Sequence, residues 1–276
     1  MARAVRDAEV MTVGPDEVVV TFVTEPGVDV ATRVGDTEVR TTGPHHVARV
    51  GELEPGTTYT VDVDGAPHDA HLPARVTTLE RPPGRLAATI ATVNDVHFGE
   101  IECGRIDDVD PAEVGPVLRS EPGEPPYPQT MNRAAIAEIG ALGPDAVVVK
   151  GDLTNLGTED EYEQFLDAYG RLGPHVHHVR GNHDGMIDPT LGVEGAPYAL
   201  DLPGVTLAVL DTVIPGIERG RVGREQLAWL DDLAARTSGP VLVFGHHQCW
   251  NVESGDRNPA YFGIHPGDSD ALVDLV

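Results

Sequence analysis

Short runs of apolar and β-branched residues, separated by turn residues, fill the first part of the chain. Such short runs are typical of strands rather than helices. Their regular spacing, with turn signals between them, favours a small β-sandwich. The predicted strands are Val18–Val23, Val28–Val34, Val47–Val50, Thr58–Val63 and Ala74–Thr78.

From Leu86 onward, apolar strands alternate with amphipathic helices, which predicts an α/β layer architecture. The prolines of 81–85 suit neither element and predict a linker. We therefore expect a β-domain at 1–80 and an α/β domain at 86–276. The predicted strands are Leu86–Val93, Ala146–Lys150, Val176–Val179, Thr206–Leu210 and Val241–Phe244. Three predicted helices are Met131–Leu142, Arg224–Ala235 and Ser269–Val276. A fourth begins at a capping box formed by Thr158 and Glu161 and runs to Tyr169.

Acidic residues outnumber basic ones by 45 to 19, which gives a formal net charge of -26. Such a chain repels phosphate backbones and anionic membrane surfaces, so we expect neither nucleic-acid binding through a basic face nor membrane binding. A small anionic substrate would need a local reversal of this field. Bound divalent metal supplies that reversal.

Cysteine is rare, with only Cys103 and Cys249 in the chain. Two cysteines make no disulfide scaffold, and a reducing, cytoplasmic setting is the simplest expectation. The first residues lack the apolar run of a signal peptide, and no stretch approaches the length of a membrane span.

Side chains that can bind metal follow four of the predicted strands directly. The carboxyl ends of strands are where open α/β sheets bind their ligands, so these side chains are expected to converge. In chain order they are Asp95 and His97, then Asp152, then Asn182, His183 and Asp184, and finally His246 and His247.

This ordered set resembles the calcineurin-like metallophosphoesterase family. The family pattern is Asp-x-His, Gly-Asp-x-x-(Asp/Asn), Gly-Asn-His-(Asp/Glu), a histidine after a strand, and a final Gly-His-x-His. The resemblance covers roughly 86–276 and implies the α/β metallophosphoesterase sandwich. Because the chain has His97 and Asn155 where purple acid phosphatases have other residues, it is more similar to the cyclic nucleotide phosphodiesterase branch.

The resemblance implies two metal ions, with Asp152 as the ligand that bridges them. Asp95 and His97 would hold the first ion, and Asn182 and His246 the second. Carboxylate, imidazole and amide ligands suit Mn, Fe or Zn. A metal-bridging hydroxide would attack phosphorus.

Two residues of the third motif have catalytic roles in this interpretation. His183 would stabilise the charged oxygens of the transition state or protonate the leaving oxygen. Asp184 would position the ring of His183 and raise its basicity.

Other polar residues near these motifs have less specific interpretations. His246 is favoured over His247 because the family ligand directly follows the strand, although His247 remains an alternative. His177 and His178 are neighbours in a strand and point to opposite faces, so they are expected to be packed or exposed. Asp211 is expected to be structural, and neither cysteine is expected to bind metal.

The segment around Tyr59 resembles the fibronectin type III signature, in which the tyrosine hydroxyl binds back to the backbone. Purple acid phosphatases also pair such a front domain with this catalytic fold. No Gly-His-x-His follows His247, and the chain ends inside a predicted helix. We therefore expect either a fragment of a longer product or an impaired form, and the fragment is favoured because a domain that ends inside an apolar helix leaves its sheet unfinished.

The sequence predicts metal-dependent hydrolysis of a small phosphodiester, such as a cyclic nucleotide, or of a phosphomonoester. The rival hypothesis is a binding or scaffold protein that keeps the phosphoesterase fold without its activity, with a protein partner for the front domain. Intact metal-binding motifs oppose this rival, and the missing final motif favours it. A metal analysis separates the two hypotheses.

Overall fold

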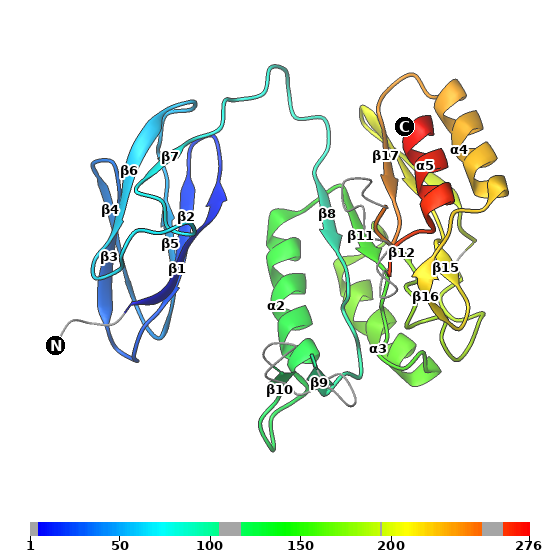
Figure 1. The fold of residues 1–276 in the computed structure, drawn as a ribbon, viewed down its shortest axis with the longest axis horizontal. Helices are drawn as coiled ribbons and strands as arrows, with labels where there is room; N and C mark the ends of the chain where they lie inside the picture. Colours follow the sequence, from blue (N-terminus) through cyan, green and yellow to red (C-terminus); the bar gives the residue numbers. More distant parts are fainter. Residues whose placement is uncertain (1–4, 105–116, 194, 250–261) are drawn as a thin grey trace. The chain divides into compact units, whose positions relative to one another are not determined.

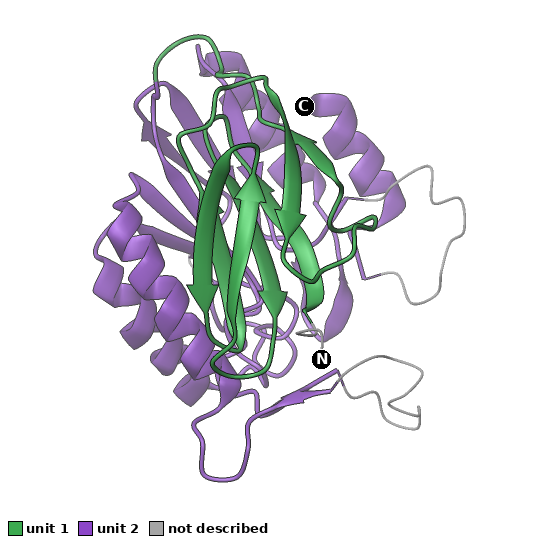
Figure 2. Cartoon of the chain, turned by 90° about the vertical axis from the view of Figure 1, so that its left-hand side faces the viewer, with its two compact units in different colours: residues 1–85 green, residues 86–276 purple. Residues whose placement is uncertain are grey.

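A computed structural model describes residues 5–104, 117–193, 195–249 and 262–276. The chain forms two compact units, Met1–Arg85 and Leu86–Val276, which Figure 2 shows in different colours. The junction between them falls at the end of the predicted linker. Among the described residues, no helix is both long and apolar enough to cross a bilayer.

The first unit is built from two antiparallel sheets of three and four strands, in the orders β1-β2-β5 and β4-β3-β6-β7. Buried valines such as Val20, Val30 and Val63 form its core. Two strands were missed by the sequence analysis: β1, and the polar β4 at the edge of its sheet, where no periodic apolar pattern is required. The strands are β1 (Arg6–Val13), β2 (Val18–Val23), β3 (Asp29–Val34), β4 (Thr37–Thr42), β5 (His45–Val50), β6 (Thr58–Val63) and β7 (Arg75–Thr77).

A tyrosine closes one corner of this unit. The backbone N–H of Glu54 donates a hydrogen bond of 2.9 Å to the hydroxyl of Tyr59, at the start of β6. The predicted bond between the tyrosine hydroxyl and the upstream backbone is therefore present.

The second unit contains two three-stranded sheets that share a core. In the first, β8 (Ile90–Val93), β11 (Ala146–Lys150) and β12 (Val176–Val179) run parallel in the order β12-β11-β8. The second has the order β13-β14-β17. Its strands are β13 (Tyr198–Leu202), β14 (Val205–Val209) and β17 (Val241–Phe244).

Alternation along the strands sorts this unit into layers. On β11, Val147 and Val149 belong to the core beneath the helices, whereas Ala146 and Val148 pack with Leu207 of β14, between the two sheets. Figure 1 shows helices on either side of the strands. These are α2 (Tyr127–Leu142), α3 (Glu159–Tyr169), α4 (Arg224–Arg236) and α5 (Pro266–Leu275), with a 3-10 turn η1 (Gly170–Leu172).

Two small two-stranded sheets complete the described parts of this unit. In one, β9 (Glu102–Cys103) pairs with β10 (Leu118–Arg119), and in the other, β15 (Val213–Ile214) pairs with β16 (Ile217–Gly220). Both lie in segments that the sequence analysis left without elements. The helix and sheet layers confirm the predicted α/β sandwich.

Several element boundaries differ from the prediction. The strand predicted from Leu86 begins only at Ile90, because its partner β11 begins at Ala146 and offers no earlier pairing. Helix α2 begins at Tyr127 rather than Met131, since Pro128 lies in the first turn, where a missing N–H costs nothing. Strand β13 was not predicted at all.

Candidate metal centre

The loops that follow β8 and β11 are joined by backbone hydrogen bonds. The N–H of Asp95 donates to the carbonyl of Gly151 at 3.1 Å, and the N–H of His97 donates to the carbonyl of Asp152 at 2.9 Å. Asp95, His97 and Asp152 all adopt left-handed backbone conformations, with φ of 53°, 43° and 46°. Each such conformation costs about 1–2 kcal/mol without glycine, and clusters of them occur at functional sites.

Two glycines let the neighbouring loops approach closely. A Cβ on Gly151, whose φ is +85°, would lie 2.5 Å from Nδ1 of His246. A Cβ on Gly181 would overlap both the carboxylate and the backbone nitrogen of Asp152. The glycines of the Gly-Asp and Gly-Asn-His motifs therefore serve to bring three ligand loops together.

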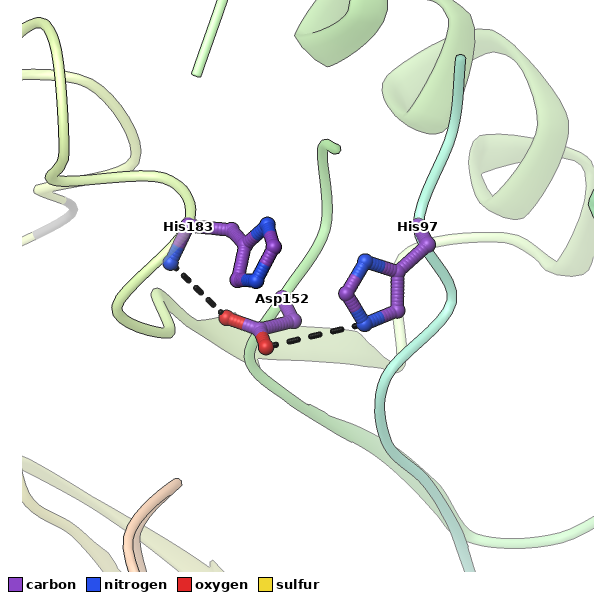
Figure 3. A group of neighbouring side chains, drawn as sticks. All are labelled: His97, Asp152 and His183. Carbon is purple, nitrogen blue, oxygen red and sulfur yellow. Dashed lines mark hydrogen bonds and ion pairs between the residues drawn. The ribbon is translucent and has the colours of Figure 1, made fainter. Parts of the chain in front are cut away.

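Asp152 lies at the centre of this cluster and is buried. Its Oδ2 lies 3.6 Å from Nε2 of His97, whereas its Oδ1 lies 3.4 Å from Nε2 of His246 and accepts a hydrogen bond of 3.0 Å from the N–H of His183. Figure 3 shows Asp152 between His97 and His183. Burial raises the pKa of the Asp152 carboxyl, and the neighbouring histidines partly oppose that rise. A cation beside the carboxylate would remove this cost.

The tautomer of His246 follows from its partners. Nδ1 lies 2.9 Å from the carbonyl oxygen of Lys150, which can only accept, so Nδ1 carries the proton. The neutral ring then directs the lone pair of Nε2 at Oδ1 of Asn182, 3.0 Å away, and at Oδ1 of Asp152. Three electron-pair donors converge, and only an additional proton or a cation can satisfy them together.

Two groups of ligand atoms share Asp152. One comprises His97, Asp152 and His183, and the other comprises Asp95, Asp152 and His246, with the ligand atoms of each group within 4.8 Å of one another. Carboxylates and imidazoles arranged around one shared carboxylate fit a pair of divalent ions. Nε2 of His97 faces this shared carboxylate, whereas its Nδ1 is buried and has no hydrogen-bond partner among the residues that the structure describes.

The grouping differs from the predicted pairing of Asp95 with His97. Val96, between them, is buried in the core beneath the helices, and the residues on either side of it fall into different groups. The ring centroid of His183 lies 4.8 Å from that of His97, and the two rings are nearly perpendicular.

In the structure, the carboxylate of Asp184 binds backbone N–H groups rather than the ring of His183. Its fully buried carboxylate accepts hydrogen bonds from the N–H groups of Leu153, Thr154 and Gly181 and from the hydroxyl of Thr154. Nδ1 of His183 instead lies 2.6 Å from the backbone carbonyl of Asn155. Asp184 therefore holds the two ligand loops together, and a carbonyl group orients His183.

His247 faces away from the ligand groups. Its Nδ1 lies 2.7 Å from Oγ1 of Thr212, and its Nε2 lies 3.1 Å from the carbonyl oxygen of Glu218. Burial, followed by the neighbouring His246, lowers the pKa of the His247 imidazole to about 4. Of the two consecutive histidines, His246 is the one that lies beside Asp152.

The remaining polar residues have structural contacts. Arg180 forms an ion pair of 2.8 Å with Asp211 and donates a hydrogen bond of 2.6 Å to the carbonyl of Pro189. His178 is buried and lies 2.9 Å from the hydroxyl of Tyr162. Both cysteines are free thiols.

The sequence analysis missed the groups that orient these ligands. They are the backbone carbonyl of Lys150, which contacts His246, and that of Asn155, which contacts His183. Backbone carbonyls have no sequence signal.

Comparison with known proteins identifies relatives of the second unit. The family model of the calcineurin-like phosphoesterases matches residues 88–275. The glycerophosphodiester phosphodiesterase GpdQ of Enterobacter lignolyticus is 32% identical over 142 residues, which are 46% of this chain and 51% of that protein. A cAMP/cGMP dual specificity phosphodiesterase of Mycobacterium tuberculosis is 29% identical over 118 residues, which are 38% of this chain and 37% of that protein.

The aligned part thus spans about half or less of these curated relatives. Among solved structures, a dimetal phosphatase from Danio rerio has a TM-score of 0.48 and 16% identity, over 68% of this chain and 77% of that one.

Proposed function

The chain belongs to the calcineurin-like phosphoesterase family, and from that premise we propose that it hydrolyses a small phosphodiester or phosphomonoester with two divalent metal ions. Asp95, His97, Asp152, Asn182 and His246 would hold the ions. The observation that carries this proposal is the arrangement of Asp152, whose two carboxylate oxygens face different histidines in two ligand groups.

Bound metal ions would lower the pKa of water and withdraw electron density from the phosphoryl oxygens. Mn, Fe and Zn all suit the mixed carboxylate and imidazole ligands. The hydrogen bonds from His246 to Lys150 and from His183 to Asn155 leave each Nε2 facing the ligand groups, as is usual for histidines beside metals.

His183 is the candidate for proton transfer. Because Asn155 holds the proton on Nδ1, proton exchange with the substrate would take place at Nε2. In the imidazolium form, Nε2 would donate a proton to the leaving oxygen of the ester. The ring stands against His97, so this proton lies beside the place where the ester would bind.

A small phosphodiester is the favoured substrate. The relatives reported above act, by their names, on glycerophosphodiesters and on cyclic nucleotides. The net charge of -26 disfavours a nucleic-acid substrate, because phosphate backbones would be repelled.

We also propose that the first unit is a fibronectin type III-like domain and that the protein is cytoplasmic. The three-stranded and four-stranded sheets and the hydrogen bond to Tyr59 support the first of these proposals. The two free thiols fit a reducing compartment.

Hydrolysis of a chromogenic diester, bis(4-nitrophenyl) phosphate, and of its monoester counterpart tests the proposed activity. With added Mn²⁺, we expect turnover that Asp152→Asn lowers about 100-fold or more, since the shared ligand is lost. Asp188→Asn, which changes an exposed carboxylate, is the control. Equal activity in all three proteins, or none in the wild type, would contradict the proposal.

A further inference from the structure

The β15–β16 hairpin contacts both loops that supply the ligands Asn182 and His246. At its turn, the N–H of Gly216 donates to the carbonyl of Gly185 at 3.0 Å, three residues after Asn182. Near its end, the carbonyl of Glu218 lies 3.1 Å from Nε2 of His247, the residue after His246. The hairpin therefore contacts the loop that carries Asn182 and also the segment that carries His246.

The hydrogen bonds of His247 define its tautomer. The carbonyl of Glu218 can only accept, so Nε2 carries the proton and Nδ1 is an acceptor in the neutral ring. The hydroxyl of Thr212 then donates to Nδ1 at 2.7 Å and accepts from the backbone N–H of His247 at 3.2 Å. The ring also packs tightly against Gly220, where a Cβ would lie within 2.4–2.7 Å of its atoms.

The hydroxyl of Thr212 fixes two groups of His247 at once, the imidazole ring and the backbone N–H. Thr212 is itself 1% exposed. His246 and His247 have ring centroids 4.8 Å apart and nearly perpendicular rings, so fixing the backbone between them fixes the direction of His246. Outside the ligand set, the His246 ring itself has one hydrogen bond among those the structure describes, from Nδ1 to the carbonyl of Lys150.

We propose that Thr212, acting through His247, is a positioning residue that sets His246 against Asn182 and Asp152. This inference rests on the proposed function, because those three residues are its candidate metal ligands. The Thr212 hydroxyl would link the end of β17 to the β15–β16 hairpin. The hairpin would in turn link the end of β17 to the loop that carries Asn182. The metal ion bound by His246 would depend on this arrangement, and the group of His97 and His183 would not.

Threonine offers matched variants for the test. Thr212→Val keeps the shape and removes both hydrogen bonds, whereas Thr212→Ser keeps the hydroxyl. Thr206→Val is the control for general destabilisation, because Thr206 is also buried and its hydroxyl donates a bond of 2.8 Å to Asp201, on the β13–β14 hairpin.

Calorimetric titration of the full chain with Mn²⁺ provides the first measurement. We expect Thr212→Val to weaken one of two binding steps about tenfold, as is typical when the partner of a metal ligand is lost. Thr212→Ser and Thr206→Val should bind both ions as the wild type does. An unchanged Thr212→Val, or an equal loss in Thr206→Val, would overturn the inference.

Nitrogen chemical shifts of the histidine rings, measured without metal, provide the second measurement. We expect a protonated Nε2 on His247 in the wild type, and a shift of the His246 resonances in Thr212→Val that Thr212→Ser does not show. If the wild type binds fewer than two Mn²⁺ ions, the proposed function fails and these shifts alone decide the inference. Unmoved His246 resonances in Thr212→Val would then overturn it.

Discussion

Replacing Asp184 with asparagine separates a structural role from a catalytic one. Its carboxylate has no exposed surface, and four donors reach it. Oδ2 accepts from Gly181 at 2.7 Å and from Leu153 at 3.1 Å, while Oδ1 accepts from the N–H of Thr154 at 2.8 Å and from its hydroxyl at 2.6 Å. Asp184→Asn keeps the shape but replaces one oxygen with an NH₂ group.

The cost of this change follows from the donors that lose their acceptor. The new NH₂ group is best tolerated beside the Thr154 hydroxyl, which can rotate to accept. The Thr154 N–H is then left unsatisfied in the interior, and the bonds to Leu153 and Gly181 lose the benefit of a charged acceptor. An unsatisfied buried donor costs about 1–3 kcal/mol and a charge-assisted bond is worth about 1.5–3 kcal/mol, so we expect a total loss of about 2–4 kcal/mol.

Urea unfolding followed by tryptophan fluorescence measures this loss in the relevant unit. Both tryptophans, Trp229 and Trp250, belong to the second unit, so the signal does not include unfolding of the first. The control is Asp188→Asn, because Asp188 accepts similar bonds from Thr190 but is exposed. Its unfolding midpoint should remain close to that of the wild type.

A different outcome would support the interpretation based on sequence. If Asp184→Asn had wild-type stability while its turnover fell and its pH profile moved, Asp184 would act through the imidazole of His183. That result would refute the assignment of Asp184 to the ligand loops.

Other predictions follow from the same contacts. Removing metal with a chelator should lower the thermal midpoint of the second unit by several degrees, because ligands that bind the folded state stabilise it. If adding Mn²⁺ back to the metal-free protein did not raise its midpoint, this prediction would be contradicted. Gly181→Ala should abolish Mn²⁺ binding, because the added Cβ overlaps Asp152, while the circular dichroism spectrum stays native. The control Gly239→Ala should bind Mn²⁺ normally, because its Cβ would meet only the carbonyl of Gly204 at 3.6 Å. Tyr59→Phe should cost the first unit about 1 kcal/mol through the lost bond to Glu54, measured as faster hydrogen exchange of the Glu54 amide, with no change in tryptophan fluorescence.

Strand β11 of the second unit could be predicted because it carries a continuous apolar run. Ala146–Lys150 has the predicted boundaries, since this run is buried as far as Val149 and ends at the Gly-Asp motif. Val176–Val179 also has the predicted boundaries, although two histidines interrupt its apolar pattern and its first half is only partly buried. The exposed edge strand β4 could not be predicted, because its alternation of threonines with charged residues carries no burial signal.

The ligands of the candidate site were predictable from residue type and order, and their supports were not. Asp152 and His246 carry side chains that few structural roles require at the end of a strand. The function of Asp184 depends on N–H groups of Leu153 and Thr154, about thirty positions earlier in the chain, which become its neighbours only through parallel pairing of β11 with β12. The contact of the Thr212 hydroxyl could not be predicted for the same reason, since its partner His247 follows a different strand.

Electron paramagnetic resonance of the chain loaded with Mn²⁺ tests most directly whether two metal ions share Asp152. Ions bridged by one carboxylate lie close enough for their unpaired electrons to couple. We predict two ions per chain with a coupled spectrum in the wild type, and a spectrum of isolated Mn²⁺ in Asp152→Asn. A single uncoupled ion in the wild type, or a coupled spectrum that persists in Asp152→Asn, would contradict the shared site.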